Sequence, residues 1–148
     1  MIVIRKAVPG DSQCIVSFQK EMAWETEKYR LKDETVIPGV SAVFNSPALG
    51  QYYVAESRGT VVASLLITFE WSDWRNANVW WFQSVYVLPD YRRQGIFRMM
   101  YEHVKSEAEE AGIAGLRLYV ESSNKVARFT YESLGMTSEH YTMYEWLR

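Results

Sequence analysis

The sequence has a single cysteine and no long apolar run, and these scarcities exclude several classes of protein. Cys14 cannot form an internal disulfide, and its apolar neighbours Ile15 and Val16 favour a buried thiol over a nucleophile. No stretch approaches the roughly 18 apolar residues of a membrane span. The N-terminal residues lack the basic and then apolar pattern of a signal peptide. We therefore expect a cytoplasmic protein with no membrane partner.

The sequence also has little net charge and few metal-ligating side chains. The 16 basic and 18 acidic residues leave a formal charge of −2, so no global field attracts nucleic acid. The two histidines, His103 and His140, have no partners at metal-ligand spacing. No Ser/His/Asp set, Walker loop or zinc cluster is present. The sequence therefore predicts neither a nucleic-acid partner nor a metal.

The hydrophobic periodicity indicates one mixed α/β domain over residues 1–148. The chain has 148 residues, of which 48% are apolar, enough for one sizeable core. The patterns predict strands at 2–8, 51–56, 60–70, 79–88, 115–120 and within 136–146, and helices at 12–27, 41–45, 96–111 and 124–134. We expect Pro38-Gly39 to act as a breaker before the short helix at 41–45. This order predicts a mixed sheet with helices on both faces and a parallel crossover over 79–120.

A basic, glycine-centred turn separates the strand at 79–88 from the next helix. The first amides of a helix lack intrahelical acceptors, and together with the helix dipole they can bind a phosphate. Gly95 lets the backbone approach such an anion without a Cβ in the way. Arg92, Arg93 and Arg98 surround this turn, which suits a pyrophosphate. The segment therefore predicts an anion-binding turn.

Two motifs resemble those of the GNAT superfamily of N-acetyltransferases. Arg92-x-x-Gly95-x-Phe97, after a Val-Tyr-Val strand, is similar to the motif Gln/Arg-x-x-Gly-x-Gly/Ala, and residues 124–136 resemble Asn-x-x-Ala-x-x-x-Tyr-x-x-x-Gly-Phe. The resemblance implies the GNAT fold, in which a mostly antiparallel sheet contains one splayed parallel strand pair, and it implies acetyl-coenzyme A as cofactor. Phe97 replaces the motif's last small residue, and we expect its ring to point away from the turn into the core.

The resemblance also implies roles for individual residues. Val85 and Val87 would hold pantetheine through backbone groups, and the Val85 N–H would help to polarise the thioester carbonyl. Tyr131 would protonate the leaving thiolate, since its reference pKa of about 10 exceeds that of a thiol near 8.5. Asn124 would cap its helix or bind the cofactor. The expected cofactor-binding residues are Val85, Val87, Arg92, Arg93, Gln94, Gly95, Ile96, Phe97, Arg98 and Asn124.

A general base and an acceptor site are harder to assign. Some relatives carry a glutamate on the strand that corresponds to 79–88, but this strand has no acid, and Gln83 and Ser84 are poor substitutes. The candidate bases, acting directly or through water, are Glu25, Glu27, Glu70, Asp73 and Glu121. Tryptophans near an acid can enclose a cationic amine. The candidate substrate-binding residues are Glu25, Glu70, Trp71, Asp73 and Trp74.

The leading hypothesis is an N-acetyltransferase that moves acetyl from acetyl-coenzyme A to a primary amine by direct attack in a ternary complex. One alternative is a non-catalytic acyl-coenzyme A-binding module, and another is an N-acyltransferase that uses a longer acyl donor. The acceptor is a small-molecule or peptide amine. The sequence is compatible with a monomer or a homodimer, in which exposed C-terminal strands would pair between subunits.

Overall fold

The computed structural model describes residues 1–148, which separate into two compact units, Met1–Arg117 and Leu118–Arg148. The first unit contains five strands, three α-helices and three short 3₁₀ helices, and the second contains one α-helix. None of the helices has the length and apolar character that crossing a membrane requires.

The first unit begins with a strand and a helix, as the sequence predicts. Its elements are β1 Ile2–Lys6, α1 Ser12–Glu27, α2 Asp33–Asn45, β2 Gln51–Ser57, β3 Thr60–Ser72, β4 Ala77–Val87, α3 Ile96–Glu110 and β5 Gly115–Arg117. Asp11 precedes α1, but its carboxylate accepts from Arg5 at 2.8 Å and from the Val8 amide at 2.8 Å instead of capping the helix. That ion pair joins β1 to the start of α1.

The sheet has the strand order β1-β2-β3-β4-β5, in which only the β4–β5 pair is parallel. The β2–β3 hairpin turns at Arg58 and Gly59, whose φ angles of 51° and 79° match a tight primed turn. The parallel ladder contains three residue pairs and ends where Trp81 lies beside Arg117. The predicted mostly antiparallel sheet with one parallel pair is therefore confirmed. β4 continues beyond this ladder to Val87.

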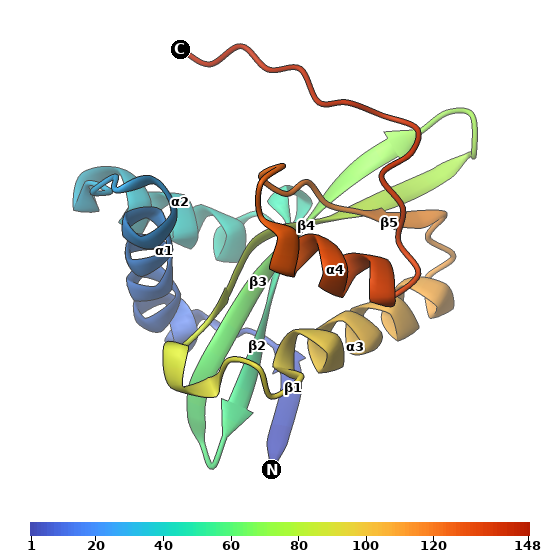
Figure 1. Cartoon of the computed structure of the whole chain (residues 1–148). Helices are drawn as coiled ribbons and strands as arrows, with labels where there is room; N and C mark the ends of the chain where they lie inside the picture. The colour runs from blue at the N-terminus through green and yellow to red at the C-terminus, as the bar shows by residue number, and fades with distance from the viewer. The chain divides into compact units, whose positions relative to one another are not determined.

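Helices cover both faces of this sheet (Figure 1). On one face, Ile15 of α1 and Val40 of α2 pack with Val54 of β2 in a buried apolar cluster. On the other face, the ring of Phe82 on β4 stacks on Tyr101 of α3 with centroids 5.6 Å apart. The apolar faces of the helices therefore pack on the two sides of one sheet, as predicted.

An extra residue interrupts the pairing of β4 with β3. Leu66 pairs with Gln83 and Ser64 pairs with Tyr86, so β3 advances by two residues while β4 advances by three. Ser84 lies in this bulge with a φ of 51°, which is uncommon for a residue other than glycine. A bulge bends its strand and increases the local twist. The last residues of β4 are therefore redirected just before the turn that leads to α3.

The sequence prediction was wrong for the segment before β2. A short helix was expected at 41–45 after a break at Pro38-Gly39, but α2 runs without interruption from Asp33 to Asn45 with Pro38 inside it. Proline removes one helix hydrogen bond and crowds the preceding turn. Burial compensates for this loss, because Val36, Val40 and Val43 all pack into the apolar cluster of the first face.

The second unit contains α4, Lys125–Ser133, and an irregular C-terminal segment. The Asn124 side chain caps α4 by accepting from the Ala127 amide at 3.1 Å, and Gly135 follows the helix with a φ of 91°. The expected strand within 136–146 is absent, and the expected strand at 115–120 is only Gly115–Arg117. Alternating aromatic residues form a strand only where a second strand supplies hydrogen-bonding partners.

Candidate functional site

The last residues of β4 present backbone groups away from β3. The Leu88 amide donates to the Val62 carbonyl at 2.9 Å, so it faces the β3 side. Successive amides alternate along an extended strand, and those of Val87 and Val85 therefore face the other edge of β4. This is the edge on which β5 pairs as far as Trp81. The residues expected to bind pantetheine through their backbone thus have their amides on the edge that such a role requires.

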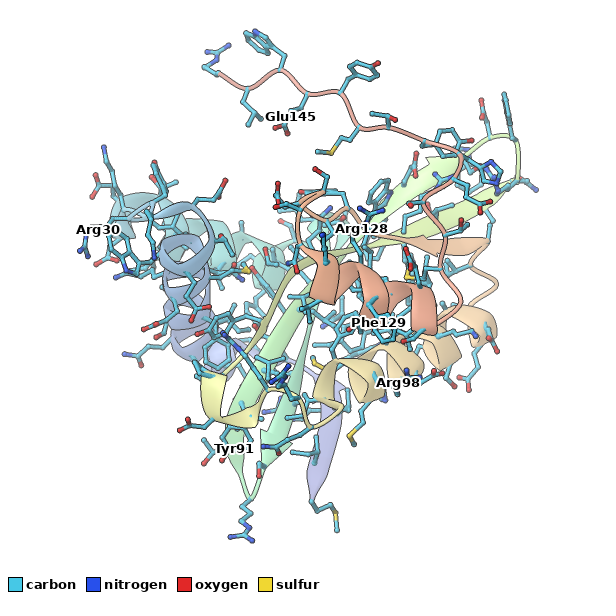
Figure 2. The ribbon with its side chains drawn as sticks, in the orientation of Figure 1. Arg30, Tyr91, Arg98, Arg128, Phe129 and Glu145 are labelled. Carbon is cyan, nitrogen blue, oxygen red and sulfur yellow. The ribbon has the colours of Figure 1, made fainter.

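The turn after β4 leads directly into the start of α3. A 3₁₀ turn at Pro89–Tyr91 is followed by Arg93 and Gly95, whose φ angles are 63° and 78°. The first intrahelical bond joins the Met99 amide to the Gly95 carbonyl at 3.0 Å. The amides of residues 96–98 precede that bond and lack intrahelical acceptors. Figure 2 shows Tyr91 on this turn and Arg98 on the first turn of α3.

The space beside Gly95 is open. A Cβ atom added to Gly95 would have no atom beyond its chain neighbours within 4 Å. Steric crowding within the protein therefore does not explain why this residue is a glycine. The positive φ and the open space together expose the helix start to an incoming group. With the helix dipole, these amides form a site that fits a phosphate or pyrophosphate.

Phe97 is half-buried, and its ring packs toward the sheet. Its ring lies edge-on to Phe82 of β4 at 6.0 Å and 6.3 Å from the ring of Tyr101, all measured between centroids. The side chain therefore packs between α3 and the sheet. The Phe97 amide remains one of those at the helix start.

The polar side chains of the turn differ in their surroundings. Arg92 donates to the Val87 carbonyl at 2.8 Å and forms an ion pair with Glu25 of α1 at 2.9 Å. The Gln94 amide group donates to the Asp90 carbonyl at 3.1 Å, which stabilises the turn internally. Arg93 is exposed and forms no ion pair. Of these residues, Arg93 has the side chain that is most available to an anion.

The acidic and aromatic candidates on the β3–β4 hairpin do not form an enclosure. The side chains of Trp71 and Trp74 are 61% and 88% exposed. Glu70 accepts from Trp81 Nε1 at 2.9 Å and from Arg117 at 2.8 Å. The hydrogen bond from Trp81, then that from Arg117, holds the pKa of Glu70 below its ordinary value. Glu70 is therefore a weaker base than a free glutamate, and Asp73 lies on the exposed hairpin turn.

A hollow on the α1–α2 side was not predicted from the sequence. It has a volume of about 320 Å³ and is lined by Lys20, Trp24, Arg30, Leu31 and Asp33. The Arg30 guanidinium lies 4.4 Å from the centroid of the Trp24 ring, and Figure 2 shows Arg30 beside α1. The α1–α2 link that carries Arg30 has no apolar periodicity, so no sequence signal indicated this hollow.

The second unit contains the expected proton donor. Tyr131 lies on α4, and burial raises the pKa of its phenol above 10.0. The phenol is therefore protonated at neutral pH and can donate. Asn124 bonds to its own helix as a cap, which was one of its two predicted uses. Glu121 accepts from the Ser123 amide at 3.1 Å within the same unit.

The sequence profile of the Acetyltransferase (GNAT) family matches residues 13–136. The chain belongs to the GNAT family of acetyltransferases. GNAT acetyltransferases use acetyl-coenzyme A, and the open helix start after β4 fits the phosphates of that cofactor.

Individual relatives are also acetyltransferases by name. A crystal structure of a possible acetyltransferase from Clostridium difficile 630 is 42% identical, with a TM-score of 0.91 over 100% of this GNAT chain and 98% of that chain. Bovine thialysine N-epsilon-acetyltransferase is 30% identical over 145 residues, 90% of this chain and 83% of that enzyme. The [ribosomal protein bS18]-alanine N-acetyltransferase of Escherichia coli K12 is 48% identical over 52 residues, only 35% of either protein.

Proposed function

We propose that this chain catalyses the transfer of acetyl from acetyl-coenzyme A to a primary amine by direct attack in a ternary complex. The observation that carries the proposal is the helix start at Gly95. It combines a φ of 78°, open space at the Cβ position and amides that precede the first bond of α3. Amides at a helix start with a positive dipole end bind phosphate groups.

The proposal gives each named residue one task. When bound, acetyl-coenzyme A supplies a thioester whose carbonyl carbon is the electrophile. The amides of residues 96–98, with Arg93 and Arg98 beside them, hold the phosphates, and the Val87 amide binds the pantetheine arm. The Val85 amide donates to the thioester oxygen. Tyr131 gives its proton to the departing sulfur, because its raised pKa keeps the phenol protonated.

A neutral amine forms the new C–N bond while the C–S bond breaks. The Tyr131 phenol proton goes to sulfur, and the proton that the attacking nitrogen loses returns through water to the phenolate, so the phenol is restored. The reference pKa of an alkyl ammonium is near 10.4, so the acceptor must first lose a proton. The lowered pKa of Glu70 makes its carboxylate a weak acceptor for that proton, so the proposal assigns this step to water.

For the acceptor we propose a small molecule with an aminoalkyl side chain. Support comes from bovine thialysine N-epsilon-acetyltransferase, which matches 90% of this chain, whereas the match to the E. coli bS18-alanine enzyme spans about a third of it. A free ammonium group is recognised by nearby acids and aromatic rings. The N-terminal amine of a ribosomal protein is the comparison substrate in the test below.

The test is a screen for coenzyme A release. Purified protein is incubated with acetyl-coenzyme A and a panel of thialysine, lysine, polyamines, aminoglycosides and a peptide that begins with alanine. Thiol release and the mass of the acetylated product are measured for each amine. We expect turnover with an aminoalkyl compound. Tight coenzyme A binding with no acetylated product would support the non-catalytic module instead, and faster turnover with butyryl- than acetyl-coenzyme A would support the longer-chain donor.

A further inference from the structure

Arg92, the first residue of the turn motif, is already engaged by the protein. Its Nε donates to the Val87 carbonyl at 2.8 Å, and its Nη2 donates to Glu25 Oε2 at 2.9 Å. The guanidinium lies 5.3 Å from the centroid of the Tyr86 ring. The Tyr86 hydroxyl in turn donates to Glu25 Oε1 at 3.4 Å. Both carboxylate oxygens of Glu25 and two sides of the guanidinium are therefore used within the first unit.

These contacts join three elements that are distant in sequence. Glu25 lies in the last turn of α1, Val87 ends β4, and Arg92 lies three residues before Gly95. The aromatic ring of Phe18 on α1 also packs on Tyr86, with centroids 5.3 Å apart. A planar guanidinium can hold two acceptors in a fixed relative position, which a single ammonium cannot do. The position of the turn relative to α1 therefore depends on Arg92.

We propose that Arg92 is a positioning residue and not a phosphate ligand: it holds the Gly95 turn against α1 through Glu25. This inference rests on the proposed function, because it concerns the binding of coenzyme A at that turn. The amides of residues 96–98 have the right direction only while the turn keeps its place. Loss of the Glu25 contact therefore weakens coenzyme A binding although no group that touches the phosphates has changed.

A direct role for Arg92 leads to the opposite expectation. If the guanidinium left Glu25 to bind a phosphate, the carboxylate would compete with the cofactor for it. Replacing Glu25 by glutamine would then release Arg92 and tighten coenzyme A binding. The sign of the change in affinity therefore separates a positioning role from a ligand role.

The experiment measures the dissociation constant of coenzyme A by calorimetry in the full-length wild type and in matched variants. Glu27→Gln is the control for Glu25→Gln, because it removes the same charge from the same helix at an exposed residue that forms no ion pair. We expect Glu25→Gln to bind coenzyme A about twofold to fivefold more weakly than Glu27→Gln, the range for a half-exposed ion pair. Equal affinity in the two variants, or tighter binding by Glu25→Gln, would overturn the proposal.

A second pair of variants tests the geometry of the contact. Arg92→Lys keeps the charge but not the planar fork, whereas Arg92→Gln loses both. A positioning role predicts that the two variants lose similar affinity, and a ligand role predicts that lysine restores most of it. The KM for acetyl-coenzyme A should rise in both variants while kcat changes little. Arg92→Lys with wild-type affinity would contradict the proposal.

The test of the Arg92 role can be separated from the test of the proposed function. Coenzyme A binding to the wild type is measured first and needs no acceptor amine. A wild-type protein that does not bind coenzyme A would refute the proposed function. A wild-type protein that binds it, together with a Glu25→Gln variant that binds no more weakly than its control, refutes only the role of Arg92.

Discussion

The glycine at the start of α3 offers the sharpest test of the anion-binding turn, through the substitution Gly95→Ala. A methyl group at this position meets no protein atom within 4 Å, so it introduces no clash in the free protein. Gly112 provides a matched control at the other end of the same helix. It has a φ of 71° against 78° for Gly95, and its Cβ position is also open.

The two substitutions should have the same effect on stability. An alanine in the left-handed region costs roughly 1–2 kcal/mol, and this strain is nearly identical at the two positions. For a chain of this size, each kcal/mol lowers the melting temperature by about 2–4 °C. Both variants should therefore melt a few degrees below the wild type, by similar amounts.

Binding of coenzyme A should separate the two variants. A methyl group at Gly95 occupies the space that a phosphate needs and displaces it from the helix amides. A hydrogen bond to a charged group contributes about 1.5–3 kcal/mol, so losing one weakens binding by roughly 10-fold to 100-fold. Gly112→Ala should bind coenzyme A as the wild type does.

Calorimetric titration with coenzyme A and thermal unfolding by circular dichroism measure these two effects. The two variants should have equal melting temperatures and unequal affinities for coenzyme A. If the two variants bound coenzyme A equally well, the phosphate would not lie at Gly95. If Gly95→Ala alone lost stability, the difference in affinity would reflect local unfolding and not a blocked site.

Three further predictions concern catalysis, stability and packing. Tyr131→Phe should lower kcat by about 100-fold or more while coenzyme A binding is unchanged. Burial raises the pKa of the Tyr131 phenol above its ordinary value, so wild-type activity should not fall between about pH 7 and pH 9, and a fall in that range would refute the assigned acid. The hydrogen bond from Arg5 holds the pKa of Asp11 below its ordinary value of 3.8. The stabilisation of the fold by this pair is therefore fully present above that pH and is lost as the pH falls below it. Asp11→Asn should therefore lower the free energy of unfolding in urea by about 1–3 kcal/mol at pH 7 and by less at pH 3. An equal loss at the two pH values would contradict a stabilising role for the Asp11–Arg5 ion pair. Phe97→Ala should lower stability by about 1–3 kcal/mol through lost packing on Phe82, without weakening coenzyme A binding; weaker binding at unchanged stability would mean that the ring contacts the cofactor.

Much of the cofactor turn could be predicted from local sequence. A β-branched strand, a glycine that adopts a positive φ and an amphipathic helix are each encoded within a few neighbouring residues. The turn at Gly95, the helix from Ile96 and the cap at Asn124 were found where the sequence placed them. The tight hairpin at Arg58-Gly59 follows the same rule, because its conformation depends on the residues in the turn itself.

The partners of the site residues could not be predicted in this way. Asp73 and Trp74 looked like parts of an acceptor pocket, but Trp74 is 88% exposed on the hairpin. Side-chain exposure depends on which elements pack together, and sequence order does not contain that information. The hollow beside Trp24 is missing from the sequence prediction for the same reason.

The sequence by itself determined the local features of this protein: its family motifs, the turn at Gly95 and most of its helices and strands. The tertiary structure decided features that depend on contacts between distant segments. The helix through Pro38 persists because Val40 is buried in the apolar cluster and the partly buried Val36 and Val43 pack against it. Arg92 meets Glu25 only because the end of β4 packs beside α1, 67 residues away in the chain. Propensity acts between neighbours, whereas burial and pairing act between segments that only the fold brings together.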